Sequence, residues 1–240
     1  MDEPIEASEE RPRFRALAIG VGIVVVVVAA VIGFGVEGDD AELDPEQRLV
    51  TITTESCGST AGGIGSGVLV GGDLAVTVAH VALTGGDVSV TTVDGSVVVG
   101  ELVGLDRTAD IAVLRLPGFD APGVEFHEFA AGEAVRIVGG QSGDVDGVAV
   151  RAVDITIEEV GGTDRVVRDG YELEADLVKG DSGAGVFSGD GGLGGIVFAV
   201  SRRTGGVTWI SDASEVRDLL DGELQPLICD PDRGYAVPVS

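Results

Sequence analysis

The chain has 240 residues, of which 44% are hydrophobic and 4% aromatic, and its 41 acidic residues against 15 basic ones give a formal net charge of −26. A field of this sign repels phosphate backbones, which argues against nucleic acid as a partner. The 39 glycines and 8 prolines, without a collagen-like period, suit a β-rich protein with many tight turns, and two cysteines are too few for a disulfide scaffold or a zinc ribbon.

Residues 16–36 form an uncharged segment whose centre is a run of five valines. A helix of this length spans about 30 Å, the thickness of the hydrocarbon core of a bilayer. Arginines precede it and acidic residues follow, so the positive-inside rule predicts that residues 1–15 stay in the cytoplasm and that the rest of the chain is exported as a single-pass membrane protein. The alternative is a cleaved signal peptide, because the small residues Ala29 and Ala30 suit a signal peptidase.

Residues 37–48 are acidic and lack an apolar period, and we interpret them as a linker between this segment and an exported domain at 49–229. Within the domain, short β-type runs broken by glycine and aspartate recur every 8–12 residues or so, as in barrels or sandwiches. The Pro/Gly-rich stretch 117–123 divides these runs into similar halves. We therefore expect an all-β fold.

One helix is expected after the last strand. Asp212 is its candidate N-cap, Glu215 follows three residues later, and the apolar stripe consists of Val216, Leu219 and Leu220. Residues 230–240 are interpreted as a C-terminal tail.

Three local sequences carry chemistry, in the order His, Asp, Ser. His80 follows Thr77-Val78-Ala79 at the end of an apolar strand, Asp110 opens the apolar strand 111–114, and Ser182 lies in Gly180-Asp181-Ser182-Gly183. A serine hydroxyl needs an imidazole to accept its proton, a carboxylate to orient that imidazole and backbone N–H donors for the oxyanion. Each motif alone has a structural reading, but the three together favour a nucleophilic serine.

The order of the three residues discriminates between folds. An α/β-hydrolase runs Ser, Asp, His and a subtilisin-type enzyme runs Asp, His, Ser. The order His80, Asp110, Ser182 in an all-β chain fits the chymotrypsin arrangement. The second histidine, His127, lies between Phe126 and Phe129 and is interpreted as structural.

These three motifs resemble the signature blocks of trypsin-like serine peptidases, and the likeness is closest to the membrane-tethered actinobacterial members of the acid-resistance periplasmic serine protease type. The resemblance covers about residues 50–229. It implies a chymotrypsin-like double six-stranded β-barrel, with barrels at about 49–120 and 124–222, that needs no metal or organic cofactor. It also implies a disulfide between Cys57 and Cys229, at the two ends of the domain.

Three features depart from that resemblance. The actinobacterial type carries several transmembrane helices, whereas this chain has one candidate, and Ala184-Gly185 stands where Gly-Pro is usual. The run Arg136-Ile137-Val138-Gly139-Gly140 mimics a zymogen-activation site, but it follows both His80 and Asp110, and we interpret it as a strand of the second barrel.

The resemblance also assigns a substrate pocket. Asp176 matches the base of the primary pocket, where a carboxylate would favour Arg or Lys at P1, whereas Val200 matches a wall position that is glycine in trypsin-like enzymes. A valine there narrows the pocket and favours small or medium apolar P1 residues. We favour the narrowed pocket.

We therefore expect a membrane-anchored extracytoplasmic serine endopeptidase acting on proteins or peptides. Ser182 attacks, His80 is the general base and then acid, Asp110 orients His80, and the N–H groups of Gly180 and Ser182 form the oxyanion hole. The alternatives are a protease-fold binding or sensor module without turnover, motivated by Ala184-Gly185 and the acidic surface, and an esterase using the same serine.

Overall fold

The computed structural model describes residues 43–85, 87–201 and 205–239. The candidate membrane segment 16–36 and the first part of the linker lie outside these residues. Within them, no helix has the length and apolar character needed to cross a membrane.

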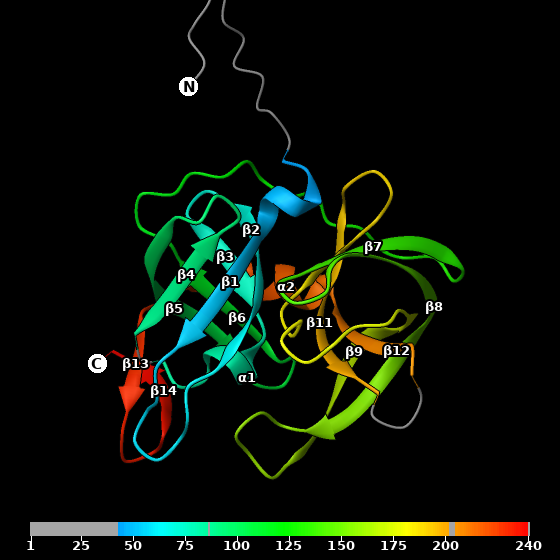
Figure 1. Cartoon of the computed structure of the whole chain (residues 1–240). Helices are drawn as coiled ribbons and strands as arrows, with labels where there is room; N and C mark the ends of the chain where they lie inside the picture. The colour runs from blue at the N-terminus through cyan, green and yellow to red at the C-terminus, as the bar shows by residue number, and fades with distance from the viewer. Residues whose placement is uncertain (1–42, 86, 202–204, 240) are drawn as a thin grey trace, which may run out of the picture. The chain divides into compact units, whose positions relative to one another are not determined.

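The described chain forms two closed antiparallel barrels of six strands each, which lie side by side (Figure 1). The first barrel closes in the order β1-β2-β3-β6-β5-β4 and consists of β1 (Leu49–Thr54), β2 (Ile64–Gly71), β3 (Leu74–Thr77), β4 (Val88–Thr92), β5 (Val97–Asp106) and β6 (Ile111–Arg115). The second closes in the order β10-β11-β12-β9-β8-β7 and consists of β7 (Glu133–Gly139), β8 (Gly143–Glu158), β9 (Arg165–Glu174), β10 (Gly185–Phe187), β11 (Leu193–Val200) and β12 (Val207–Asp212). The predicted all-β class is confirmed.

The sequence pattern of each strand reflects how many of its faces are covered. In β1, Val50 and Ile52 are fully buried in the first barrel while the threonines between them are more exposed, the period of two expected of a strand with one apolar face. In β6, Ile111 to Leu114 are all buried, because this strand also contacts the C-terminal helix. The zymogen-like run at 136–140 begins inside β7, as the sequence predicts.

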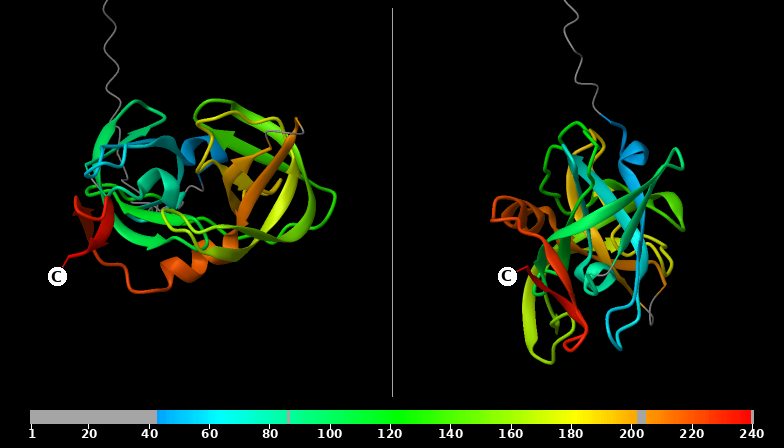
Figure 2. Two further views of the ribbon diagram at one scale, coloured as in Figure 1. Left: turned by 90° about the horizontal axis from the view of Figure 1, so that it is seen from below. Right: turned by 90° about the vertical axis from the view of Figure 1, so that its left-hand side faces the viewer.

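Two short helices complete the barrels. The first, α1 (Ala79–Ala82), follows β3 directly. The second, α2 (Ala213–Leu220), begins where predicted, with the Asp212 side chain accepting a hydrogen bond from the Ser214 N–H at 2.7 Å. Helix α2 contacts β5 and β6 of one barrel and β11 and β12 of the other, so it bridges the two (Figure 2).

The ends of the domain are more ordered than the sequence suggested. Pro45–Arg48 forms a 3-10 helix, and the buried Arg48 guanidinium donates hydrogen bonds to the carbonyls of Leu69, Pro122 and Gly123. Where a tail was expected, β14 (Tyr235–Pro238) pairs with β13 (Leu227–Asp230) in a hairpin that contacts β5. Strands of only four residues carry little sequence signal.

A disulfide joins Cys57 to Cys229, with Cα atoms 5.6 Å apart and a sequence separation of 172 residues. It connects the loop after β1 to the C-terminal hairpin. The same hairpin donates hydrogen bonds to the segment just after α1, from the N–H of Cys229 to Gly85 O at 3.1 Å and from that of Ala236 to Leu83 O at 2.8 Å.

Replacing both Cys57 and Cys229 by serine is expected to lower the free energy of unfolding. The chain-entropy model gives about 5 kcal/mol for a loop of this length, and real bridges often deliver less. Denaturant unfolding of the oxidised wild type and of the double variant measures the difference. Equal stabilities, or two free thiols titrating in the folded wild type, would contradict the prediction.

Candidate active site

His80 is positioned by the transition from β3 into α1. Ala79, Val81 and Ala82 are buried and fix this single helical turn, while the His80 side chain keeps 39% of its surface exposed. The N–H of Ala79 donates to the carbonyl of Asp110 at 3.1 Å, which ties the start of the turn to the segment before β6. The imidazole is therefore exposed to solvent, while the backbone that carries it is fixed by buried neighbours.

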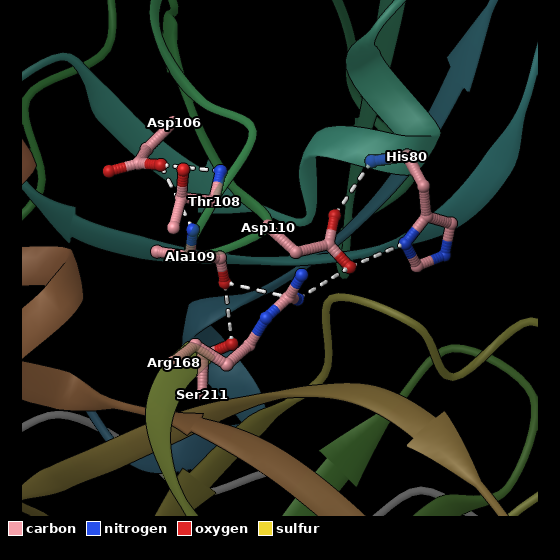
Figure 3. Close-up of polar contacts among 7 residues, drawn as sticks. All are labelled: His80, Asp106, Thr108, Ala109, Asp110, Arg168 and Ser211. Carbon is pink, nitrogen blue, oxygen red and sulfur yellow. Dashed lines mark hydrogen bonds and ion pairs between the residues drawn. The ribbon is translucent and has the colours of Figure 1, made fainter. Parts of the chain in front are cut away.

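Asp110 holds the backbone and the ring of His80 at once (Figure 3). Its Oδ1 accepts the His80 N–H at 2.9 Å, and its Oδ2 lies 2.9 Å from His80 Nδ1. The Asp110 side chain is only 4% exposed. Its φ of +60° is in the left-handed region, where aspartate and asparagine are the side-chain-bearing residues most often found. An Nδ1–H donated to this carboxylate leaves Nε2 as the free base of His80.

Asp106 shapes the turn that leads to Asp110. Its Oδ1 accepts hydrogen bonds from the N–H groups of Thr108 at 2.7 Å and Ala109 at 2.9 Å (Figure 3). This carboxylate bonds within its own turn, and Asp110 is the aspartate that meets His80.

Ser182 lies on a tight turn that requires glycine on each side. Gly180 has φ +108° and Gly183 has φ +90°, and a Cβ at Gly183 would collide with the carbonyl oxygen of Ser66 on β2. Ser66 also donates its hydroxyl to Gly180 O at 3.1 Å, and its N–H donates to Ser182 O at 2.7 Å. The first barrel thus fixes the turn that belongs to the second.

Asp181 anchors the same turn from inside the protein and is fully buried. Its Oδ1 accepts the N–H groups of Gln141 and Ser142, both at 3.0 Å, and its Oδ2 accepts the Ser142 hydroxyl at 2.5 Å and the Val178 N–H at 3.0 Å. Burial raises the pKa of this carboxyl, but the four hydrogen bonds lower it by more, so the net pKa lies below its ordinary value.

His80 and Ser182 line one cavity of 510 Å³ at the junction of the barrels. In the described part of the chain, Ser182 Oγ makes no hydrogen bond to His80, and catalytic hydrogen bonds of unliganded enzymes often tighten only around substrate. The N–H groups of Gly180 and Ser182 have no acceptor among the described residues, so both remain able to donate to a ligand.

The rest of this cavity is apolar apart from one lysine at its wall. Its other lining residues are Val178, Lys179, Val197, Phe198, Ala199 and Val200. Val200, predicted as a wall residue of the substrate pocket, is one of the residues that line this cavity. Asp176 is exposed and does not line the cavity.

Other predicted residues take structural roles. His127 Nε2 lies 2.7 Å from Glu133 Oε1, away from His80. Ala184 donates its N–H to Asp181 O at 2.8 Å, and β10 begins at Gly185, so this departure from Gly-Pro fits a regular strand. Nowhere in 43–85, 87–201 or 205–239 are His, Cys, Asp or Glu side chains grouped to hold a metal ion.

Sequence reasoning did not find Ser66 or Arg168. Ser66 has no local signal, because its role depends on contact between barrels. Arg168 is buried in β9 and contacts Asp110. The sequence feature that could have indicated a buried arginine is its place directly after the apolar pair Val166-Val167.

Two six-stranded antiparallel barrels with a His–Asp pair and a serine at their junction define a chymotrypsin-like serine peptidase. A family model described as trypsin-like peptidase domain matches residues 65–196, more than half of the chain. The chain therefore belongs to the trypsin-like peptidase family and is a serine protease.

Solved structures show the same fold. The active form of the Rv3671c protease from M. tuberculosis has a TM-score of 0.68 and 23% identity, over 82% of this chain and 85% of that one. The inactive form of the same protease has a TM-score of 0.63 and 24% identity, over 73% of this chain and 88% of that one. The HtrA-type protease AlgW, with a tripeptide, has a TM-score of 0.63 and 19% identity, over 73% of this chain and 59% of that one. A search of curated protein sequences finds no match.

Proposed function

We propose that the protein is an endopeptidase whose catalytic triad is His80, Asp110 and Ser182. Ser182 Oγ attacks the peptide carbonyl while His80 Nε2 accepts its proton, and His80 then returns this proton to the leaving amine. Asp110 holds the imidazole in the required tautomer. The N–H groups of Gly180 and Ser182 donate to the oxyanion. Water then hydrolyses the acyl-enzyme, with His80 again as the base.

The observation that carries this proposal is the pair of hydrogen bonds between Asp110 and His80, at 2.9 Å each, beside a cavity that Ser182 also lines. A fluorophosphonate probe tests it, because such probes label only activated serines. Labelling of the wild type that is lost in Ser182→Ala supports catalysis. A folded wild type that is neither labelled nor hydrolytic would instead be a binding module.

We further propose that the protease works outside the cytoplasm, attached to the membrane by a helix at 16–36. The arginines before this segment and the acidic residues after it support the orientation, and the disulfide supports an oxidising compartment. Adding an external protease to spheroplasts that express the full chain tests the topology, because the cytoplasmic membrane is then the only barrier. A domain that resists digestion until the cells are lysed would refute it.

The cavity beside Ser182 supports apolar P1 residues of small or medium size. Valine, alanine and phenylalanine side chains form its wall, and Lys179 is a cation that disfavours arginine or lysine in the same space. Profiling on a peptide library is expected to show kcat/KM at least about 10-fold higher for apolar than for basic P1 residues.

Two variants test this specificity. Val200→Gly is expected to enlarge the cavity and shift the preference toward larger P1 residues, whereas Asp176→Ser is expected to leave the profile unchanged. Dominant cleavage after Arg or Lys that disappears in Asp176→Ser would show that Asp176 forms the base of the pocket after all.

A further inference from the structure

Arg168 crosses from the second barrel to the turn that carries Asp110. Its side chain is only 1% exposed, and its Nη1 lies 3.4 Å from Asp110 Oδ2, the oxygen that also meets His80 Nδ1 (Figure 3). The same Nη1 lies 3.4 Å from the carbonyl oxygen of Ala109. The guanidinium carbon lies 4.9 Å from the centre of the Phe198 ring, on the strand that forms the wall of the cavity.

The environment of this arginine is unusual for a residue that only stabilises a fold. Its Nε and Nη2 have no hydrogen-bond partner among the described residues, so desolvation of the guanidinium is incompletely compensated. Replacing a buried ion pair by apolar side chains of similar size often leaves stability unchanged or raises it. Among the described residues, the carboxylate of Asp110 is the one charged group that forms an ion pair with Arg168.

We propose that Arg168 is a positioning residue of the triad, which holds the Asp110 carboxylate toward His80 and shares with the imidazole the carboxylate oxygen that orients it. This inference rests on the proposed function. Asp110 Oδ2 is shared between His80 and a permanent cation. The negative charge that would stabilise a protonated His80 is therefore partly neutralised, and a proton on His80 brings a second positive charge close to Arg168.

Four other charged side chains belong to the segments around this site. Lys179 lines the cavity with His80, Asp106 bonds within its own turn, and Asp181 faces Gln141 and Ser142. On α2, Glu215 accepts a hydrogen bond from the N–H of Asp169, and burial raises its pKa. None of these side chains has a hydrogen bond or ion pair to Arg168 in the described part of the chain, so a change in pH dependence on replacing Arg168 is assigned to the arginine.

The experiment is the pH profile of kcat/KM of the full chain with three replacements at this position. Arg168→Gln keeps an amide donor but removes the charge, Arg168→Met removes both, and Arg168→Lys keeps the charge. Both neutral variants are expected to move the acidic limb of the profile to higher pH by about one unit or more. Arg168→Lys is expected to keep the limb near its wild-type position.

Arg48→Met is the matched control, because Arg48 is also a fully buried arginine but donates to backbone carbonyls of β2 and of the segment that connects the barrels. It is expected to lower stability without moving the acidic limb. A limb that stays in place in the neutral variants, or moves equally in Arg48→Met, overturns the inference. It is also overturned if neither neutral variant folds while Arg168→Lys does, because Arg168 would then serve the fold. A wild type without turnover would refute the proposed function instead.

Discussion

Replacing Ser182 or His80 by alanine is expected to lower peptide hydrolysis by about 10⁴-fold or more, because nucleophile and base act as a unit. Both variants are expected to fold, because the His80 side chain is 39% exposed and Ser182 is partly exposed, so neither is part of a barrel core. Hydrolysis rates and the circular dichroism of each variant measure the two effects. Full activity in Ser182→Ala would refute the mechanism.

Asp110→Asn is expected to cause a loss of similar size. Asparagine tolerates the left-handed backbone at this position, so the substitution changes the carboxylate without straining the turn. Its amide presents a donor where His80 needs an acceptor. Asp106→Asn, four residues earlier, is the matched control and is expected to retain activity within about threefold, because its Oδ1 can still accept the N–H groups of Thr108 and Ala109. The reverse result would move the orienting role to Asp106.

Asp181→Asn is expected to damage both the oxyanion turn and the fold. An amide can replace one carboxylate oxygen, but its NH₂ group then faces the N–H of Val178, which loses its acceptor in a buried site. Such a loss costs about 1–3 kcal/mol of stability. Displacing one oxyanion donor lowers kcat by about 10²–10³-fold. Because Asp181 anchors the turn that carries the N–H groups of Gly180 and Ser182, the variant is expected to lose activity in this range.

The pH dependence of stability gives an independent measure of Asp181. Because its pKa is lowered in the folded state, the carboxylate contributes stability above the ordinary pKa of an aspartate, and this contribution is lost as the pH falls through the lowered value. Asp181→Asn removes that dependence. Asp190→Asn gives the comparison, because a hydrogen bond from the Ser188 hydroxyl also lowers the pKa of Asp190, but this carboxylate is exposed in the turn after β10. Solvent screening makes its contribution to the pH dependence the smaller one. Wild-type activity in Asp181→Asn would show that the turn around Ser182 keeps its conformation without this carboxylate.

Much of the fold was predictable because its signals are local. Alternating valines in short runs predict half-buried strands, and Asp212 marks the start of α2. The sites of His80, Asp110 and Ser182 were also local, since each lies at a strand end or a glycine turn. The structure adds that Asp110 and His80 meet in two hydrogen bonds.

What the sequence did not predict depends on contacts between distant segments. Arg168 lies 58 residues from Asp110 along the chain, and the Ser66 hydroxyl reaches Gly180 across the barrel junction, with a separation of 114. The buried end of the linker at Arg48 depends on carbonyls more than 70 residues away as well as on Leu69. No periodicity or motif carries such information, because the partners are specified by the closed fold.

The hydrogen bonds of Asp181 bear on whether the enzyme needs proteolytic activation. Every donor to its carboxylate in the described part of the chain belongs to the second barrel, so no newly cut chain end is required to form the serine turn. The zymogen-like run at 136–140 lies mostly within a strand, where cutting would destroy the barrel. The catalytic site is therefore expected to be active as soon as the chain has folded. Control of such a protease must then come from its location and from which molecules can enter its cavity.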